Sequence, residues 1–124
     1  MSLEMYREYV LDLYKNPLNK GIIENPSHEF MKNNPLCGDE IKIQLVIKNN
    51  KIENLKFDGI GCAISMASAS LLTEKLKNLT IEEAKNINKD DILELIKIPL
   101  SPVRIKCALL SLDVLRGALE NARN

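Results

Sequence analysis

The segment IKIQLVIKNNKIENLKF, residues 41–57, carries the strongest β-sheet signal of this chain. Apolar residues at 41, 43, 45 and 47 alternate with polar residues at 42, 44 and 48, as in a strand with one buried face. The pair Asn49-Asn50 tolerates positive φ angles and favours a tight turn. The pattern predicts a β-hairpin whose second strand covers residues 52–57. In this second strand the alternation of apolar and polar residues is interrupted between residues 52 and 55, which indicates a β-bulge.

Helical patterns lie on both sides of this hairpin. The predicted helices cover residues 3–15, 63–77, a short stretch after a capping box at Thr80, residues 88–96, and a last helix from the Ser101-Pro102 cap to about residue 122. Residues 27–34 predict a further extended piece. The sequence therefore predicts one α+β domain over residues 1–124, with a small antiparallel sheet of two or three strands covered by about four to five helices.

Two helices show an apolar stripe that we expect to face the core. The stripes consist of Tyr6, Tyr9, Val10, Leu13 and Tyr14 in the first helix, and of Val103, Cys107, Leu110, Val114 and Ala118 in the last.

Composition and charge exclude several classes of protein. Of the 124 residues, 45% are hydrophobic, and 17 basic side chains balance 17 acidic ones. A net charge near zero argues against nucleic acid as the main partner. No apolar run reaches the roughly 20 residues that a membrane span needs, and the charged first ten residues are unlike a secretory signal. Three cysteines without an export signal indicate reduced thiols and a cytoplasmic protein.

The three cysteines stand in distinctive local sequences. These are Cys37-Gly38-Asp39, Gly59-Ile60-Gly61-Cys62-Ala63-Ile64-Ser65 and Arg104-Ile105-Lys106-Cys107. The first two flank the hairpin, and the outer ends of a hairpin lie at the same edge of the sheet. Cys107 reaches that edge if the last helix packs with its N-terminal end toward it. Three thiolates and one carboxylate are enough to fill a tetrahedral metal site.

The neighbouring residues favour reactive thiolates. Gly59 and Gly61 allow backbone conformations that keep the thiol of Cys62 open, and a helix N-terminus at Cys62 favours the ionised sulfur. Two cations, Arg104 and Lys106, precede Cys107 and favour its ionised form as well. Asp39 adds a hard oxygen, which binds a thiophilic metal less firmly than a fourth thiolate would. Such a site would hold its cargo and also release it.

Each of these residues also has a purely structural interpretation. A free cysteine is most often a small buried hydrophobe, and Cys107 lies on an apolar stripe. Asp39 could be a turn residue, and Arg104 and Lys106 could be solvated surface charges. For His28, the only histidine, a surface or strand-edge role is favoured over metal ligation. The wide spacing of the cysteines is unlike the close pairs of a zinc finger.

Over nearly its full length the chain resembles the U-type iron–sulfur cluster assembly scaffolds, the IscU/SufU/NifU-like family. The resembling segments are Tyr14-Lys15-Asn16-Pro17 with Asn19-Lys20-Gly21, Asn34-Pro35-Leu36-Cys37-Gly38-Asp39, Phe57–Ser65 with Ala67-Ser68-Ala69-Ser70, and Arg104-Ile105-Lys106-Cys107-Ala108-Leu109-Leu110.

The resemblance implies a scaffold, not an enzyme, on which iron and sulfide form a transient [2Fe–2S] cluster for delivery to apo-protein acceptors. Cys37, Asp39, Cys62 and Cys107 would be the ligands, and a zinc or iron ion often occupies the same site. A PLP-dependent cysteine desulfurase would supply sulfur as a persulfide, with Cys107 or Cys37 as the acceptor. Arg104 and Lys106 would offset the cluster's negative charge and help to dock the desulfurase.

Features of two branches of the family meet in this chain. The housekeeping branch has histidine immediately before the third cysteine, whereas this chain has Lys106, as the SufU-type branch does. The SufU-type branch also carries an insertion before this motif, and residues 78–100 are too few to hold it. A zinc-dependent sulfurtransferase of the SufU type is therefore the alternative function, and a purely structural zinc domain is a third. Residues 100–104 depart from the Leu-Pro-Pro-Val-Lys segment that Hsp70-type chaperones bind, so a chaperone or iron donor as partner stays open.

Overall fold

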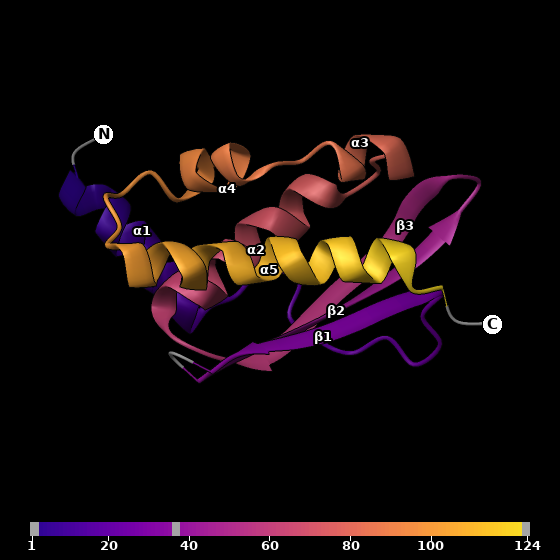
Figure 1. Ribbon diagram of the computed structural model, residues 1–124, viewed down its shortest axis with the longest axis horizontal. Coiled ribbons are helices and arrows are strands. Elements are labelled where there is room, and N and C mark those ends of the chain that lie inside the picture. Colours follow the sequence, from indigo (N-terminus) through magenta and orange to yellow (C-terminus); the bar gives the residue numbers. More distant parts are fainter. Residues whose placement is uncertain (1–2, 36–37, 123–124) are drawn as a thin grey trace.

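The computed structural model describes residues 3–35 and 38–122 (Figure 1). Its elements in chain order are α1 (Leu3–Lys15), β1 (His28–Asn34), β2 (Asp39–Lys48), β3 (Lys51–Ile60), α2 (Ala63–Leu76), α3 (Ile81–Lys85), α4 (Lys89–Ile96) and α5 (Pro102–Glu120). The strands form one antiparallel sheet in the order β1-β2-β3. The predicted α+β architecture is confirmed, with three strands and five helices in the part of the chain described.

The hairpin that the sequence predicts is the centre of this sheet. Asn49 and Asn50 form its turn with φ angles of 52° and 66°, so both asparagines occupy the left-handed region as expected. The register shifts after Val46, which pairs with Asn54, while the next residue of β2 pairs with Ile52. Glu53 is therefore the extra residue of a bulge, inside the interval where the alternation slips.

The outer edge of β3 is covered by the segment that follows α1. The N–H of Gly21 donates to the carbonyl of Phe57, and the N–H of Phe57 donates to the carbonyl of Asn19, at 2.9 and 3.0 Å. The N–H of Leu18 also donates to Oγ of Ser70 on α2, at 3.1 Å. These bonds satisfy groups that an open sheet edge would leave exposed.

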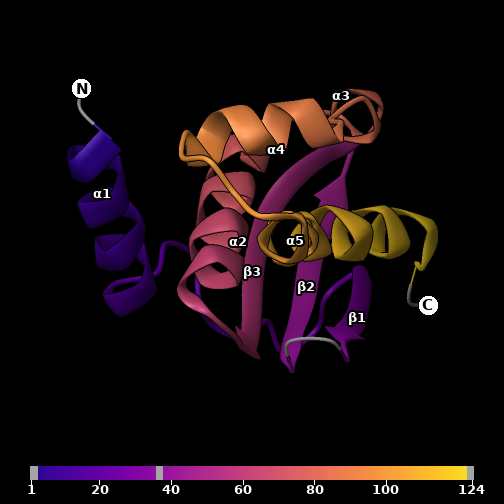
Figure 2. The ribbon, with the colours of Figure 1, turned by 60° about the vertical axis from the view of Figure 1, so that its left-hand side comes forward.

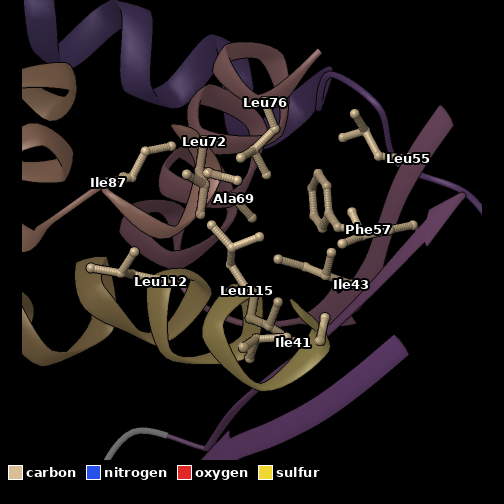
Figure 3. Packing of buried hydrophobic residues seen from close by; sticks show 14 of the residues in the cluster. Ile41, Ile43, Leu55, Phe57, Ala69, Leu72, Leu76, Ile87, Leu112 and Leu115 are labelled. Carbon is tan, nitrogen blue, oxygen red and sulfur yellow. The ribbon is translucent and has the colours of Figure 1, made fainter. Parts of the chain in front are cut away.

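The hydrophobic core lies between the sheet and the helices α2 and α5. Figure 3 shows Phe57 and Ile43 of the sheet facing Leu72 of α2 and Leu115 of α5, and all four side chains are almost completely buried. Burial of one such side chain stabilises the fold by about 1.5–3 kcal/mol. The core thus holds α5 across the sheet and fixes the direction of its N-terminal end.

The first helix is attached to the rest of the molecule along one side only. Figures 1 and 2 show α1 at the end of the molecule, beside α2. Val10 and Leu13 are buried there, in a second apolar cluster that also contains Cys107. The expected five-residue stripe is therefore too wide: Tyr9 and Tyr14 are 43% and 47% exposed, because α1 packs mainly against α2, and that contact buries Val10 and Leu13.

The helix ends follow the predicted capping signals, with small differences at the last helix. Thr80 and Glu83 form the predicted capping box of α3, and Ser101 accepts a hydrogen bond from the N–H of Arg104 at the start of α5. The helix α5 ends at Glu120 and not at about residue 122. Val103 was expected to be buried and is 53% exposed, because the first turn of α5 extends beyond the elements that cover its later turns. Among the described helices, none has the length and apolarity to cross a membrane.

Candidate metal centre

Three of the four predicted ligand residues meet at one end of the sheet. Asp39 opens β2, Cys62 directly precedes α2, and Cys107 lies in the second turn of α5. The two sulfur atoms and a carboxylate oxygen all lie within 4.8 Å of one another. Ligand atoms around a tetrahedral zinc ion are about 3.3–3.8 Å apart, given the usual metal–ligand bond lengths. The donor set and its spacing therefore fit a thiophilic metal ion or cluster after small side-chain adjustments.

The predicted convergence is confirmed for Asp39, Cys62 and Cys107. The fourth predicted ligand, Cys37, lies outside the described residues, so its place in the site stays a prediction. Gly38, which follows it, has a φ of 72°, in the region that favours glycine.

Two buried serines of α2 contact the turn of α5 that carries Cys107. Ser65 and Ser68 of α2 are both buried, and their hydroxyls lie 3.2 and 2.5 Å from the carbonyl oxygens of Cys107 and Ala108. Small side chains let the two helices approach closely enough for these bonds. The apolar core holds α5 in the predicted orientation, with its N-terminal end toward the ligand loops, and these bonds lie beside that core.

Asp39 is almost completely buried, with 1% of its surface exposed. Its Oδ1 accepts a hydrogen bond of 2.9 Å from the N–H of Cys62. Its Oδ2 accepts a hydrogen bond from the hydroxyl of Ser65 and lies 3.8 Å from Sγ of Cys62. The carboxylate also lies at the N-terminus of α2, where the helix dipole favours negative charge. These hydrogen bonds thus offset the free-energy cost of burying the acidic side chain.

Gly61 makes room for this carboxylate. A Cβ atom on Gly61 would lie 2.7 Å from Oδ1 of Asp39, closer than such atoms approach. Gly61 was expected to keep the thiol of Cys62 open, but its immediate role is the space that it leaves for Asp39. Gly59 has a φ of 143°, and a Cβ there would lie 2.0 Å from the carbonyl oxygen of Glu40. Glycine at 59 therefore allows β3 to pass close to β2.

The two described thiols differ in accessibility. Cys62 is partly exposed, whereas Cys107 is 1% exposed and packs in the cluster with Val10 and Leu13. The structural interpretation of Cys107 as a buried apolar residue and its place in the candidate site are therefore both correct. An external group reaches Cys62 directly, but it reaches Cys107 only after a local movement.

The predicted supporting cations lie outside the ligand cluster. Arg104 and Lys106 are both exposed on α5, in agreement with either a surface role or a docking role. Lys106 lines a groove of about 430 Å³ between β1 and α5, together with Lys32 and Asp113. The groove gives Lys106 a position from which it can contact a partner protein.

His28 lies far from the candidate site along the sheet. It pairs with Leu45, whereas Asn34 at the other end of β1 pairs with Asp39. The Nδ1 atom of His28 lies 2.9 Å from Oγ of Ser27, and burial lowers the pKa of His28 below its usual value of 6.5. The expected strand-edge role is confirmed.

Ser65 belongs to this site, although the sequence did not identify it as a site residue. Ser65 was quoted only as part of the motif around Cys62, although its hydroxyl contacts Asp39. The available signal was a small polar residue three positions after the N-cap residue Cys62. The side chain at this position of a helix can reach back to the N-terminal end.

Three comparisons with known proteins agree with this geometry. Residues 5–124 match the model of the NifU-like N-terminal domain family. The zinc-dependent sulfurtransferase SufU of Bacillus subtilis is 40% identical over 124 aligned residues, which cover 86% of this chain and 84% of that protein. The iron–sulfur cluster assembly scaffold protein IscU of Escherichia coli is 35% identical, over 96% of this chain and 94% of that protein.

A solved structure shows the same fold. The crystal structure of FiSufU from Fervidobacterium islandicum has a TM-score of 0.79 and 30% identity, and the match covers 96% of this chain and 99% of that one. A NifU-like N-terminal domain from Brucella abortus, at 19% identity and a TM-score of 0.75, shares the fold.

Proposed function

Because the chain belongs to the NifU-like N-terminal domain family, we propose that it is a scaffold that assembles a [2Fe–2S] cluster and transfers it to apo-proteins. The observation that carries the proposal is the convergence of Asp39, Cys62 and Cys107 from three separate elements onto one point. In this role the protein is a carrier and not an enzyme. Cysteines that are not joined in a disulfide, such as Cys62 and Cys107, fit the reducing environment of the cytoplasm.

We assign the ligands as Cys37, Asp39, Cys62 and Cys107. Three thiolates supply the soft sulfur donors that iron and zinc share, and the Asp39 oxygen is the weakest bond of the set. Cys62 lies at the accessible rim, so an acceptor protein can approach the cargo from that side. This combination supports both binding and release.

Sulfur would arrive from a cysteine desulfurase. A thiolate of the scaffold attacks the outer sulfur of the desulfurase persulfide, a new S–S bond forms, and the old S–S bond breaks to release the desulfurase thiolate. Cys107 and Cys37 are both acceptor candidates, and Cys107 requires a local movement before it can react. Arg104 and Lys106, exposed on α5, would help to dock the desulfurase and offset the cluster's charge.

The alternative function is a zinc-dependent sulfurtransferase. The 40% identity to the Bacillus subtilis protein and the lysine at position 106 favour it. The lengths of the two proteins favour the scaffold. The alignment with the Bacillus subtilis protein has 124 positions but includes only 86% of this chain, so at the other positions the relative has residues that this chain lacks. The Escherichia coli scaffold aligns over 96% of this chain with nearly its whole length.

Anaerobic reconstitution separates the two functions. The protein is incubated with iron, a cysteine desulfurase and free cysteine, and then mixed with an apo-ferredoxin. A scaffold gives a visible-absorbing cluster that moves to the ferredoxin, and Cys62→Ser abolishes its formation while leaving the helical content unchanged. Tightly retained zinc, no cluster and faster desulfurase turnover would instead establish the sulfurtransferase.

A further inference from the structure

The hydroxyl of Ser65 contacts all three candidate ligand residues that the structure describes. It donates to Oδ2 of Asp39, lies 3.7 Å from Sγ of Cys62, and lies 3.2 Å from the carbonyl oxygen of Cys107. Ser65 is 1% exposed, in the first turn of α2. One side chain thus joins the strand, the ligand loop and α5.

The hydroxyl has one proton to donate, and its acceptors are unequal. A carboxylate oxygen is a stronger acceptor than a peptide carbonyl or a sulfur atom, because it carries charge. The proton therefore goes to Asp39, and the oxygen of Ser65 faces the thiol of Cys62, which can donate to it. The carbonyl of Cys107 remains as a second acceptor if the carboxylate turns.

Both oxygens of Asp39 are consequently held by donors from α2. The N–H of Cys62 holds Oδ1 at 2.9 Å, and the hydroxyl of Ser65 holds Oδ2 on the side of the Cys62 sulfur. A carboxylate oxygen has two lone pairs. Oδ2 can therefore keep the Ser65 hydrogen bond and still present a lone pair toward the thiols.

We propose that Ser65 is a positioning residue of the metal centre, which fixes Asp39 so that Oδ2 faces the thiol of Cys62 and is ready to bind a metal. The inference rests on the proposed function, since it takes Asp39 as a ligand. Residues that hydrogen-bond a ligand orient it toward the metal, and their loss typically weakens metal binding about 10- to 100-fold.

Ser68 provides a matched control on the same helix. Like Ser65 it is 1% exposed, and its hydroxyl also bonds to a backbone carbonyl of α5, that of Ala108. Its other partner is Ser111, not a candidate ligand. A substitution of Ser68 therefore removes an equivalent buried hydroxyl without touching Asp39.

The test uses Co²⁺ as a spectroscopic probe of the full chain. Its affinity is measured by competition with a chelator, and its visible bands report the ligand geometry. We expect Ser65→Ala to weaken Co²⁺ binding by about tenfold or more and to shift the visible bands. Ser65→Thr, which keeps the hydroxyl, restores both, and Ser68→Ala leaves both at the wild-type values even where it lowers the melting temperature.

A double-mutant cycle with Asp39→Ala tests whether Ser65 acts through Asp39. We expect Ser65→Ala to have no further effect on Co²⁺ affinity once the carboxylate is gone. Additive losses, or a Ser65→Ala protein that binds Co²⁺ like the wild type, would overturn the inference and leave the scaffold function intact. If Asp39→Ala itself leaves affinity and spectrum unchanged, Asp39 is not a ligand, and both the inference and the proposed ligand set are wrong.

Discussion

The backbone N–H of Cys62 donates a hydrogen bond of 2.9 Å to Oδ1 of Asp39, although 23 residues separate them in the chain. Cys62 is the N-cap residue of α2 and its own side chain makes no capping hydrogen bond. The carboxylate of β2 satisfies the backbone N–H of this N-cap residue, and its negative charge lies at the N-terminus of the helix, where it is favourable. The same carboxylate offers an oxygen to the candidate metal centre, so the start of the helix and the ligand set are coupled.

Replacement of Asp39 by alanine is expected to slow the transfer of a bound cluster severalfold. An acceptor thiolate displaces a weakly bound oxygen more readily than a sulfur, and the substitution removes that oxygen and leaves an apolar group in its place. Loss of the hydrogen bond from the backbone N–H of Cys62 also lowers stability, by about 1–3 kcal/mol. Transfer to an apo-ferredoxin, followed by absorption, gives the rate. Asp58→Ala on β3 is the control, and faster transfer from the Asp39 variant would contradict this account.

Substitution of Gly61 by alanine should weaken Co²⁺ binding as well as the fold. The new Cβ would lie 2.7 Å from Oδ1 of Asp39 and displace the carboxylate, and overpacking of this kind costs about 1–3 kcal/mol. Gly117→Ala is the control, since its Cβ would lie 2.3 Å from Phe30. The control should lose stability and keep its metal affinity. Wild-type Co²⁺ affinity in the Gly61 variant would show that the position of Asp39 does not depend on this glycine.

Removal of the metal should lower the melting temperature without unfolding the protein. The main core cluster, between the sheet and the helices α2 and α5, includes neither Asp39 nor Cys62 nor Cys107, the candidate ligands that the structure describes. A metal present at a hundredfold excess over its Kd adds about 2.7 kcal/mol, which corresponds to a shift of about 10 °C for a domain of this size. Melting followed by circular dichroism, with and without a chelator, measures the shift. Complete loss of helical signal on chelation at 25 °C would establish a structural zinc domain instead.

Stability should fall as the pH decreases from about 7.5 to 5.5, in part because of His28. Burial lowers the pKa of His28 below 6.5, so over this range the unfolded chain binds more protons than the native protein, and acid favours unfolding. Glu74 and Glu82 also have lowered pKa values, caused first by hydrogen bonds from Lys77 and Asn50 respectively, but they titrate below 4.5. His28→Gln should therefore reduce the fall in the urea midpoint between these two pH values. An equal fall in both proteins would exclude His28 as its cause.

Local signals of the sequence were sufficient for the elements and for the outline of the site. The Asn49-Asn50 turn, the bulge at Glu53 and the cap at Ser101 each depend on a few neighbouring residues, and each is present as predicted. The meeting of Asp39 with Cys62 follows from hairpin geometry alone. These features depend on backbone preferences that adjacent residues determine.

Features that depend on packing between distant elements could not be predicted. The burial of Val10 beside the exposed Tyr9 and Tyr14 depends on where α2 lies, and the exposure of Val103 depends on how far α5 extends beyond its neighbours. The contact between Ser65 and Asp39 depends on side-chain conformations at a junction of three elements. Helical periodicity does not specify which side of a stripe another element will cover.

The central claim is that three cysteines and Asp39 surround one metal. X-ray absorption at the zinc edge of the zinc-loaded protein tests it most directly, because it counts sulfur and oxygen neighbours of the ion. We expect three sulfur atoms at about 2.3 Å and one oxygen at about 2.0–2.2 Å, and we expect the oxygen contribution to change in Asp39→Ala. A zinc ion with two or fewer sulfur neighbours, or a spectrum unchanged in the Asp39 variant, would contradict it.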